Sequence, residues 1–310
     1  MNKYKNTIIT MSLLATAGLV GCSSSVIDIY NEFEASEVIG KLDEMVFSEN
    51  PNRYDIFNYA KENVPKMPDI EMSSTMVNSL IYSIYQNADY YGNASVLLQD
   101  ELKSLESKLD VDIIDSSIIS KIPEEYKMVK AFLEEIDSNY LKLVKANSIY
   151  SVDVNLEKIA KDFDKYINND TKGYLNFRIK ESNLEIYNMN SDTYNIKNIM
   201  ILINDIYNNI DKVEGVTQIE NWVEHLKYYF DMIFSASQDK FVDENGILDS
   251  EILKEFKTEI KTYQDTEFGK IFEEYIKILE ENKLNVDSEK VTKYLETVYE
   301  NLNSFLVVEE

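Results

Sequence analysis

The chain has 310 residues, 44% of them hydrophobic, and a formal net charge of −25 that comes from 56 acidic and 31 basic residues. A surface this acidic repels polyanions, and no run of lysine and arginine offsets it, which excludes nucleic acid as the main ligand. With only 8 glycines and 4 prolines, the chain lacks the turn residues that sandwiches, barrels and doubly wound sheets need at their corners. The composition therefore favours an all-α protein, a packed multi-helix bundle.

The first 25 residues have the pattern of an export signal that ends in a lipidation site. A short basic start precedes an apolar stretch over residues 7–20, and this stretch is too short to span a bilayer as a stable helix. It leads into the sequence Leu-Val-Gly-Cys at residues 19–22, which three serines follow. The pattern predicts a signal peptide over residues 1–21.

This segment resembles the lipobox of bacterial lipoproteins, in which a small residue fits the signal peptidase site and the cysteine accepts a lipid. The resemblance covers residues 1–25 and nothing beyond them. It implies cleavage after Gly21 and a diacylglyceryl thioether on Cys22, with palmitate as a typical acyl chain. Since two or more acyl chains give stable anchoring, we expect an extracytoplasmic protein attached to the cell membrane, or to an outer membrane if the host has one.

Cys22 is the only cysteine of the chain, so the body can form no disulfide, no cysteine-based zinc site and no catalytic thiol. The residues after it suggest a flexible tether over 22–27. An Asn- and Gly-containing interruption at 168–173 is where we place a boundary between helical subdomains over 28–169 and 170–310. A single elongated bundle is the alternative.

The first part of the body shows apolar residues at helical spacing. We predict a helix from residue 29 to the break at 50–51, which Gly40 could interrupt, and a short helix over 53–63. Pro65 and Pro68 then favour a linker over 64–72. A further helix should start near Ser73, and another should follow beyond Gly92 with a seam formed by Leu98, Leu102, Leu105 and Leu109.

Pro123 and the two glutamates after it predict the start of the next helix. We predict a further helix over residues 155–167. Residues 174–189 permit two interpretations, a helix or a small hairpin, because part of the segment alternates in polarity. The predicted buried stripe of the helix after Pro123 is Tyr126, Val129, Leu133, Ile136, Tyr140 and Leu143.

The last third of the chain contains strong helical stripes. One covers 196–210, and the next follows a capping box formed by Thr217 and Glu220 and contains Trp222. Three more helices should cover 253–263, 268–279 and 291–305.

Two features could carry chemistry, and both have a structural interpretation. His225 is the only histidine, which excludes a two-histidine metal site, and we interpret it as a partly exposed structural residue. The acidic window 243–251 resembles a calcium loop, but an EF-hand alignment places Phe241 and Ile252 at two main ligand positions. We therefore predict a turn through Gly246 followed by a helix that Asp249 or Ser250 caps.

The abundant acidic residues offer no specific catalytic pair. Adjacent glutamates at 134–135, 273–274 and 280–281 are interpreted as solvated faces, and we predict no catalytic residue, no metal site and no cofactor. The leading hypothesis is a lipid-anchored binding or scaffold module for a protein or envelope partner. A carboxylate-dependent cell-envelope hydrolase and a solute-binding receptor are the alternatives.

Overall fold

The computed structural model describes residues 29–49, 51–146, 148–188, 193–234 and 241–306. The described chain is mostly helical, and its strands form two antiparallel pairs, so the all-α class is confirmed. The chain divides into two compact units, unit 1 over Met1–Asn168 and unit 2 over Asn169–Glu310.

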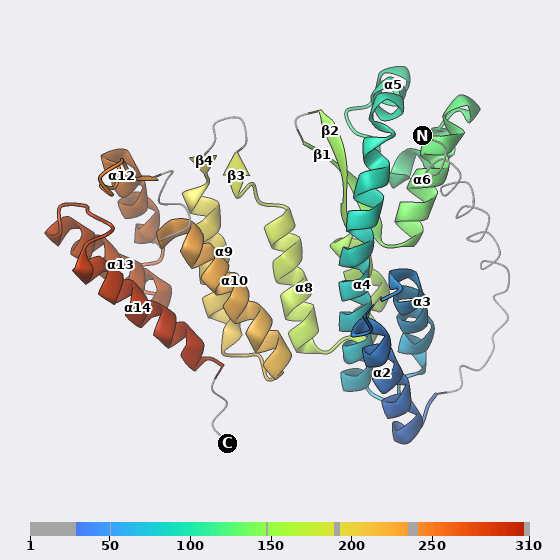
Figure 1. Ribbon diagram of the computed structural model, residues 1–310, viewed down its shortest axis with the longest axis horizontal. Helices are drawn as coiled ribbons and strands as arrows, with labels where there is room; N and C mark the ends of the chain where they lie inside the picture. The colour runs from blue at the N-terminus through green and yellow to red at the C-terminus, as the bar shows by residue number, and fades with distance from the viewer. Residues whose placement is uncertain (1–28, 50, 147, 189–192, 235–240, 307–310) are drawn as a thin grey trace. The chain divides into compact units, whose positions relative to one another are not determined.

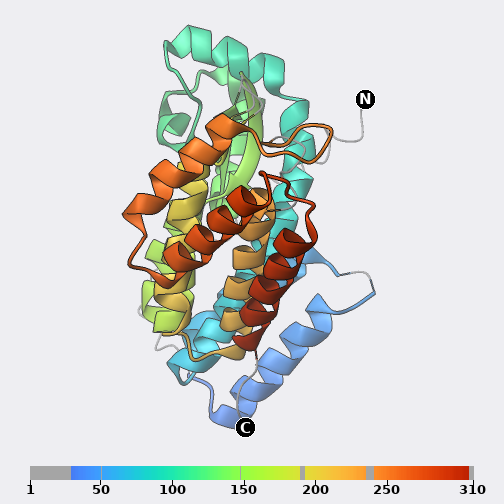
Figure 2. The same cartoon turned by 90° about the vertical axis from the view of Figure 1, so that its left-hand side faces the viewer.

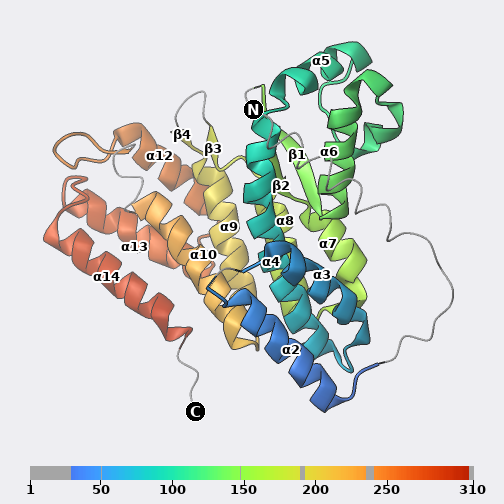
Figure 3. The ribbon, with the colours of Figure 1, turned by 45° about the vertical axis from the view of Figure 1, so that its right-hand side comes forward.

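Unit 1 opens with three helices that pack against one another (Figure 3). Helix α2 (Glu32–Val46) begins with a capping box between Asn31 and Glu34 and continues without a break through Gly40. Helix α3 (Arg53–Asn63) has the predicted bounds. The 3₁₀ turn η1 (Val64–Lys66) leads to helix α4 (Ile70–Val96).

Helix α4 is longer than the sequence predicted. It starts at the N-cap Asp69, whose carboxylate accepts the amide hydrogen of Met72, so it begins ahead of the expected start near Ser73. It also continues through Gly92 before helix α5 (Gln99–Leu109). The predicted linker over 64–72 is therefore largely ordered as a turn and a helix start.

The predicted stripe of the helix after Pro123 extends beyond the helix that forms. The turns η2 (Ser116–Lys121) and η3 (Glu124–Tyr126) precede helix α6 (Lys127–Ser138), which ends before Tyr140. Tyr140 has a positive φ of 56°, and Leu143 belongs to strand β1 (Leu141–Ala146). Tyr140 and Leu143 are buried as predicted, but Leu143 lies in a strand and the Tyr140 ring, outside both helix and strand, packs against the rings of Phe57 and Phe163.

Strand β1 pairs antiparallel with β2 (Ile149–Val154), and the resulting hairpin lies against α4 (Figure 1). The Gln99 side chain, just beyond α4, donates to the carbonyl oxygen of Tyr150 and accepts from its amide. The Tyr150 hydroxyl donates to Glu106 on α5 and accepts from the amide of Ile114. Contacts with residues far along the chain thus fix the hairpin.

The predicted interruption at 168–173 is mostly helical. Helix α7 (Leu156–Phe163) and turn η4 (Asp164–Tyr166) end unit 1, and helix α8 (Asn169–Ser182) begins directly afterwards and passes through Gly173. The helical interpretation of 174–189 therefore holds as far as Ser182. The small hairpin lies further along, where β3 (Tyr187–Asn188) pairs with β4 (Thr193–Tyr194).

Unit 2 contains the remaining predicted helices. Thr217 lies inside the helix that it was predicted to cap, because this helix begins at Val216. In unit 2 the last two helices lie side by side (Figure 2). The bounds are α9 (Ile196–Ile210), α10 (Val216–Phe234), α12 (Ser250–Glu259), turn η5 (Ile260–Thr262), α13 (Glu267–Glu281) and α14 (Glu289–Ser304).

Two helical glycines of unit 2 make a matched test of its packing. A Cβ added to Gly269 in α13 would lie 1.9 Å from the carbonyl oxygen of Tyr263, whereas one added to Gly173 would meet no atom within 4 Å. We expect Gly269→Ala to lower the free energy of unfolding by roughly 1–3 kcal/mol. Gly173→Ala should raise it by about 0.5–1 kcal/mol. Urea unfolding followed by fluorescence of Trp222, the single tryptophan, measures both, and equal effects would contradict the close approach at Gly269.

Candidate functional site

The predicted lipidation site Cys22 and the tether over 22–27 lie outside the described residues. Lipidation therefore stays a prediction. Among the described residues, no helix has both the length and the apolar character needed to cross a membrane.

The acidic window 243–251 forms the predicted turn and cap. The Asp243 carboxylate accepts the amide hydrogens of Asn245 and Ile247, both at 2.9 Å, and Gly246 has the positive φ of 71° that the turn requires. Asp249 caps α12 by accepting from the two amides that follow Ser250. Backbone amides thus occupy one oxygen of each of these two carboxylates. Within the described ranges no three His, Cys, Asp or Glu side chains are grouped as a metal site would need.

The paired glutamates behave differently from one another. Glu134 and Glu273 are exposed, as a solvated face predicts, and Glu280 forms an ion pair with Lys257. Glu135 is half-buried and accepts a 2.9 Å hydrogen bond from the Tyr91 hydroxyl. The solvated-face interpretation is therefore wrong for Glu135, which is part of the packing between α6 and α4.

His225 lies within a polar cluster between α8 and α10. Its Nδ1 is 2.9 Å from the carbonyl oxygen of Asn221 and 3.3 Å from the Tyr174 hydroxyl. Because a carbonyl oxygen can only accept, Nδ1 carries the proton and Nε2 is the basic nitrogen of the neutral ring. Tyr174 and Phe177 contact the imidazole with their rings nearly perpendicular to it. These contacts support the structural interpretation of His225.

The rest of this cluster is satisfied within itself. Arg178 donates to Glu181 at 2.6 Å, and the Tyr229 hydroxyl donates to the other oxygen of the same carboxylate. Burial, with the Glu181 charge as the next cause, raises the pKa of Tyr229 well above its usual value. The hydroxyl therefore stays protonated and acts as a donor, so the cluster holds α8 to α10.

A groove of about 450 Å³ runs along one face of α14. Its apolar lining residues, Val286 and Leu295, are buried. The carboxylates of Asp287, Glu296 and Glu300 line it as well, and all three residues are exposed. Within the described part of the chain, none of these carboxylates forms an ion pair with lysine or arginine. The groove thus combines an apolar floor with an unneutralised acidic edge.

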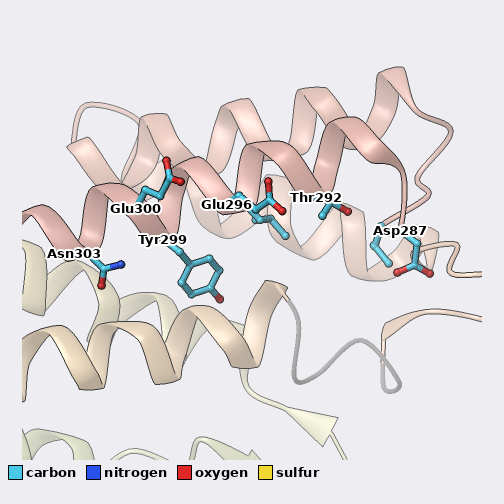
Figure 4. A pocket seen from close by; sticks show the side chains of 8 residues that line it. Asp287, Thr292, Glu296, Tyr299, Glu300 and Asn303 are labelled. Atoms are coloured by element: carbon cyan, nitrogen blue, oxygen red, sulfur yellow. The ribbon is translucent and has the colours of Figure 1, made fainter.

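Hydrogen bonds hold α14 in the position that forms this groove. Tyr299 points from α14 toward the neighbouring helix (Figure 4), and its hydroxyl donates to Asp231 on α10. On another face of α14, the Tyr294 hydroxyl donates to the carbonyl oxygen of Ile271 on α13 at 2.7 Å. The groove is therefore built on a helix that two neighbours fix, which is the setting that a binding site needs.

Sequence reasoning missed this groove. Glu296 and Glu300 are one helical turn apart, next to the buried stripe of α14, and such a pair has the pattern of an ordinary solvated face. What sets this pair apart is that Val286 of the preceding loop lines the same groove, and the Val286 amide donates to the carbonyl oxygen of Gly246 at 2.9 Å. No local pattern encodes that contact.

Comparison with protein-family models, with curated proteins and with solved structures found no match. The lipobox-like segment and the groove on α14 are therefore the two features of the chain that bear on its function.

The pH dependence of stability tests the surroundings of His225. Burial lowers the pKa of His225 below its ordinary value of about 6.5. As the pH falls through that value, the unfolded chain binds a proton that the folded imidazole resists, so the free energy of unfolding decreases. Between pH 7.5 and 5.5 we expect His225→Gln to lose less stability than the unmodified protein, by up to about 1 kcal/mol. Urea unfolding at the two pH values measures this, and identical losses would show that the imidazole is not protected from protonation.

Proposed function

We propose that the protein is a membrane-anchored, extracytoplasmic lipoprotein that binds a protein or envelope partner through the groove on α14. The lipobox-like sequence that ends at Cys22 supports the anchor. The groove supports the binding role, and the observation that carries the proposal is its combination of buried Val286 and Leu295 with exposed carboxylates. Apolar area at the centre with polar groups around it is the usual anatomy of a recognition site.

The hydrolase hypothesis gains no support from this groove. Such an enzyme needs a pair of carboxylates in a cleft, with the pKa of one raised so that it can act as an acid. Burial, with the charge of Glu259 as a second cause, raises the pKa of Glu255. Glu255 lies on α12 and is not among the residues that line the groove. We therefore keep the binding role as the proposal.

Replacement of the anchoring cysteine tests the first half of this proposal. In cells fed an alkyne-tagged fatty acid, the unmodified protein should incorporate the tag and sediment with the membrane fraction. Cys22→Ala should do neither, because it removes the thiol that accepts the lipid. Ser23→Ala, which changes the neighbouring residue and keeps the thiol, is the control. Equal labelling of the Cys22→Ala form would contradict lipidation at this position.

Site-specific cross-linking tests the second half. Thr292 lines the groove, whereas Thr297 is exposed elsewhere on the same helix and does not line it. A photoreactive amino acid placed at Thr292 should capture a defined partner on intact cells, and the same group at Thr297 should not. Mass spectrometry of the cross-linked peptides identifies the contact. Capture that is the same at both positions, or at neither, would contradict a binding role for the groove.

A further inference from the structure

We propose that the occupant of the α14 groove is a basic amphipathic segment of another polypeptide. This inference rests on the proposed binding function and specifies its partner. Lysine or arginine side chains of the segment pair with Glu296 and Glu300, and an apolar side chain between them packs on Leu295.

Charge complementarity is the first argument. Three lining residues are acidic and none is basic. The two lysines near the start of α14, Lys290 and Lys293, do not line the groove. Glu296 and Glu300 are like charges one turn apart, an arrangement that destabilises a helix until a cation neutralises it. The net charge of −25 adds a long-range field that attracts basic partners and speeds their association.

The dimensions of the groove are the second argument. From Thr292 to Asn303, the lining residues of α14 cover about 16 Å along the helix axis at a rise of about 1.5 Å per residue. An extended segment of roughly five residues has the same length at about 3.3 Å per residue. Successive side chains of such a segment point to opposite faces, so a segment twisted across the groove can offer apolar groups to the floor and basic groups to the edge.

The apolar floor distinguishes this occupant from a bare divalent cation. Calcium takes six to eight oxygen ligands at about 2.3–2.6 Å, and a floor that contains Val286 and Leu295 provides none from its side chains. A bare metal ion would use the carboxylates and leave these buried apolar groups unused. An amphipathic segment uses both, and we therefore argue for it.

Peptide binding to the full-length protein in zwitterionic detergent tests the proposal. The probe is a fluorescent five-residue peptide that alternates lysine with leucine, and its partner peptide has glutamate in place of lysine. The double variant Glu296→Gln with Glu300→Gln removes two charges from the groove. The control, Glu273→Gln with Glu281→Gln, removes two exposed charges from α13, so both proteins have the same net charge.

We expect the lysine peptide to bind the unmodified protein and the control with affinities within a factor of two, and the groove variant about fivefold more weakly. That ratio corresponds to two exposed ion pairs, each contributing about 0.5 kcal/mol. The loss should shrink in high salt because surface charges are screened. Equal affinity of the groove variant and the control would overturn the proposal, as would equal binding of the glutamate peptide or displacement of the lysine peptide by 1 mM calcium.

Failure of this inference can be told apart from failure of the proposed function. If a photoreactive group at Thr292 captures a partner whose cross-linked peptide contains no lysine or arginine, the binding function stands and the basic segment is wrong. If Thr292 captures nothing more than Thr297 does, the groove is not a binding site at all. A cross-linked peptide with alternating basic and apolar residues supports both.

Discussion

One cluster of aromatic side chains determines where the helices of unit 2 can lie. It joins two phenylalanines of α10, Phe230 and Phe234, to Phe256 of α12 and Phe272 of α13. The ring centroids of Phe234 and Tyr275 are 4.5 Å apart. Each fully buried aromatic side chain contributes roughly 1.5–3 kcal/mol, and edge-to-face pairs add about 0.5–1.5 kcal/mol. Helices α10 and α13 both hold α14 through hydrogen bonds. The groove therefore depends on the aromatic cluster, although no ring of that cluster lines the groove.

Besides filling the core with their rings, several tyrosines donate a hydrogen bond to a carboxylate. The chain has 56 acidic residues but only 31 basic ones, so cations are too few to pair with every carboxylate. In both units a tyrosine packs its ring against the core and donates its hydroxyl to a carboxylate, which adds a hydrogen bond to that charge. Two of these carboxylates also pair with a cation, Glu106 with Lys145 and Glu181 with Arg178. The pairs are Tyr91 with Glu135, Tyr150 with Glu106, Tyr229 with Glu181 and Tyr299 with Asp231.

Other acidic residues are exposed, and those along α14 lie next to an apolar floor. This juxtaposition makes an excess of negative charge, a general property of the composition, part of a candidate site. A lipid anchor at the start of the chain and a recognition groove on its last helix would place the two functions at opposite ends of the sequence.

The sequence by itself determined the helical class and most helices, because an amphipathic helix records in its own spacing which face is buried. The stripes of α9, α10, α13 and α14 are examples. The spacing could not reveal the hairpin at 141–154, since Leu143 fits both a helical stripe and a buried strand, and contacts such as that of Gln99 with Tyr150 hold the strand pair in place. It could not reveal the groove either, because Val286 of the preceding loop, which lines it together with Glu296 and Glu300, is placed by a contact with Gly246. Contacts between residues far apart in the chain form both the hairpin and the groove, and local periodicity holds no information about such contacts.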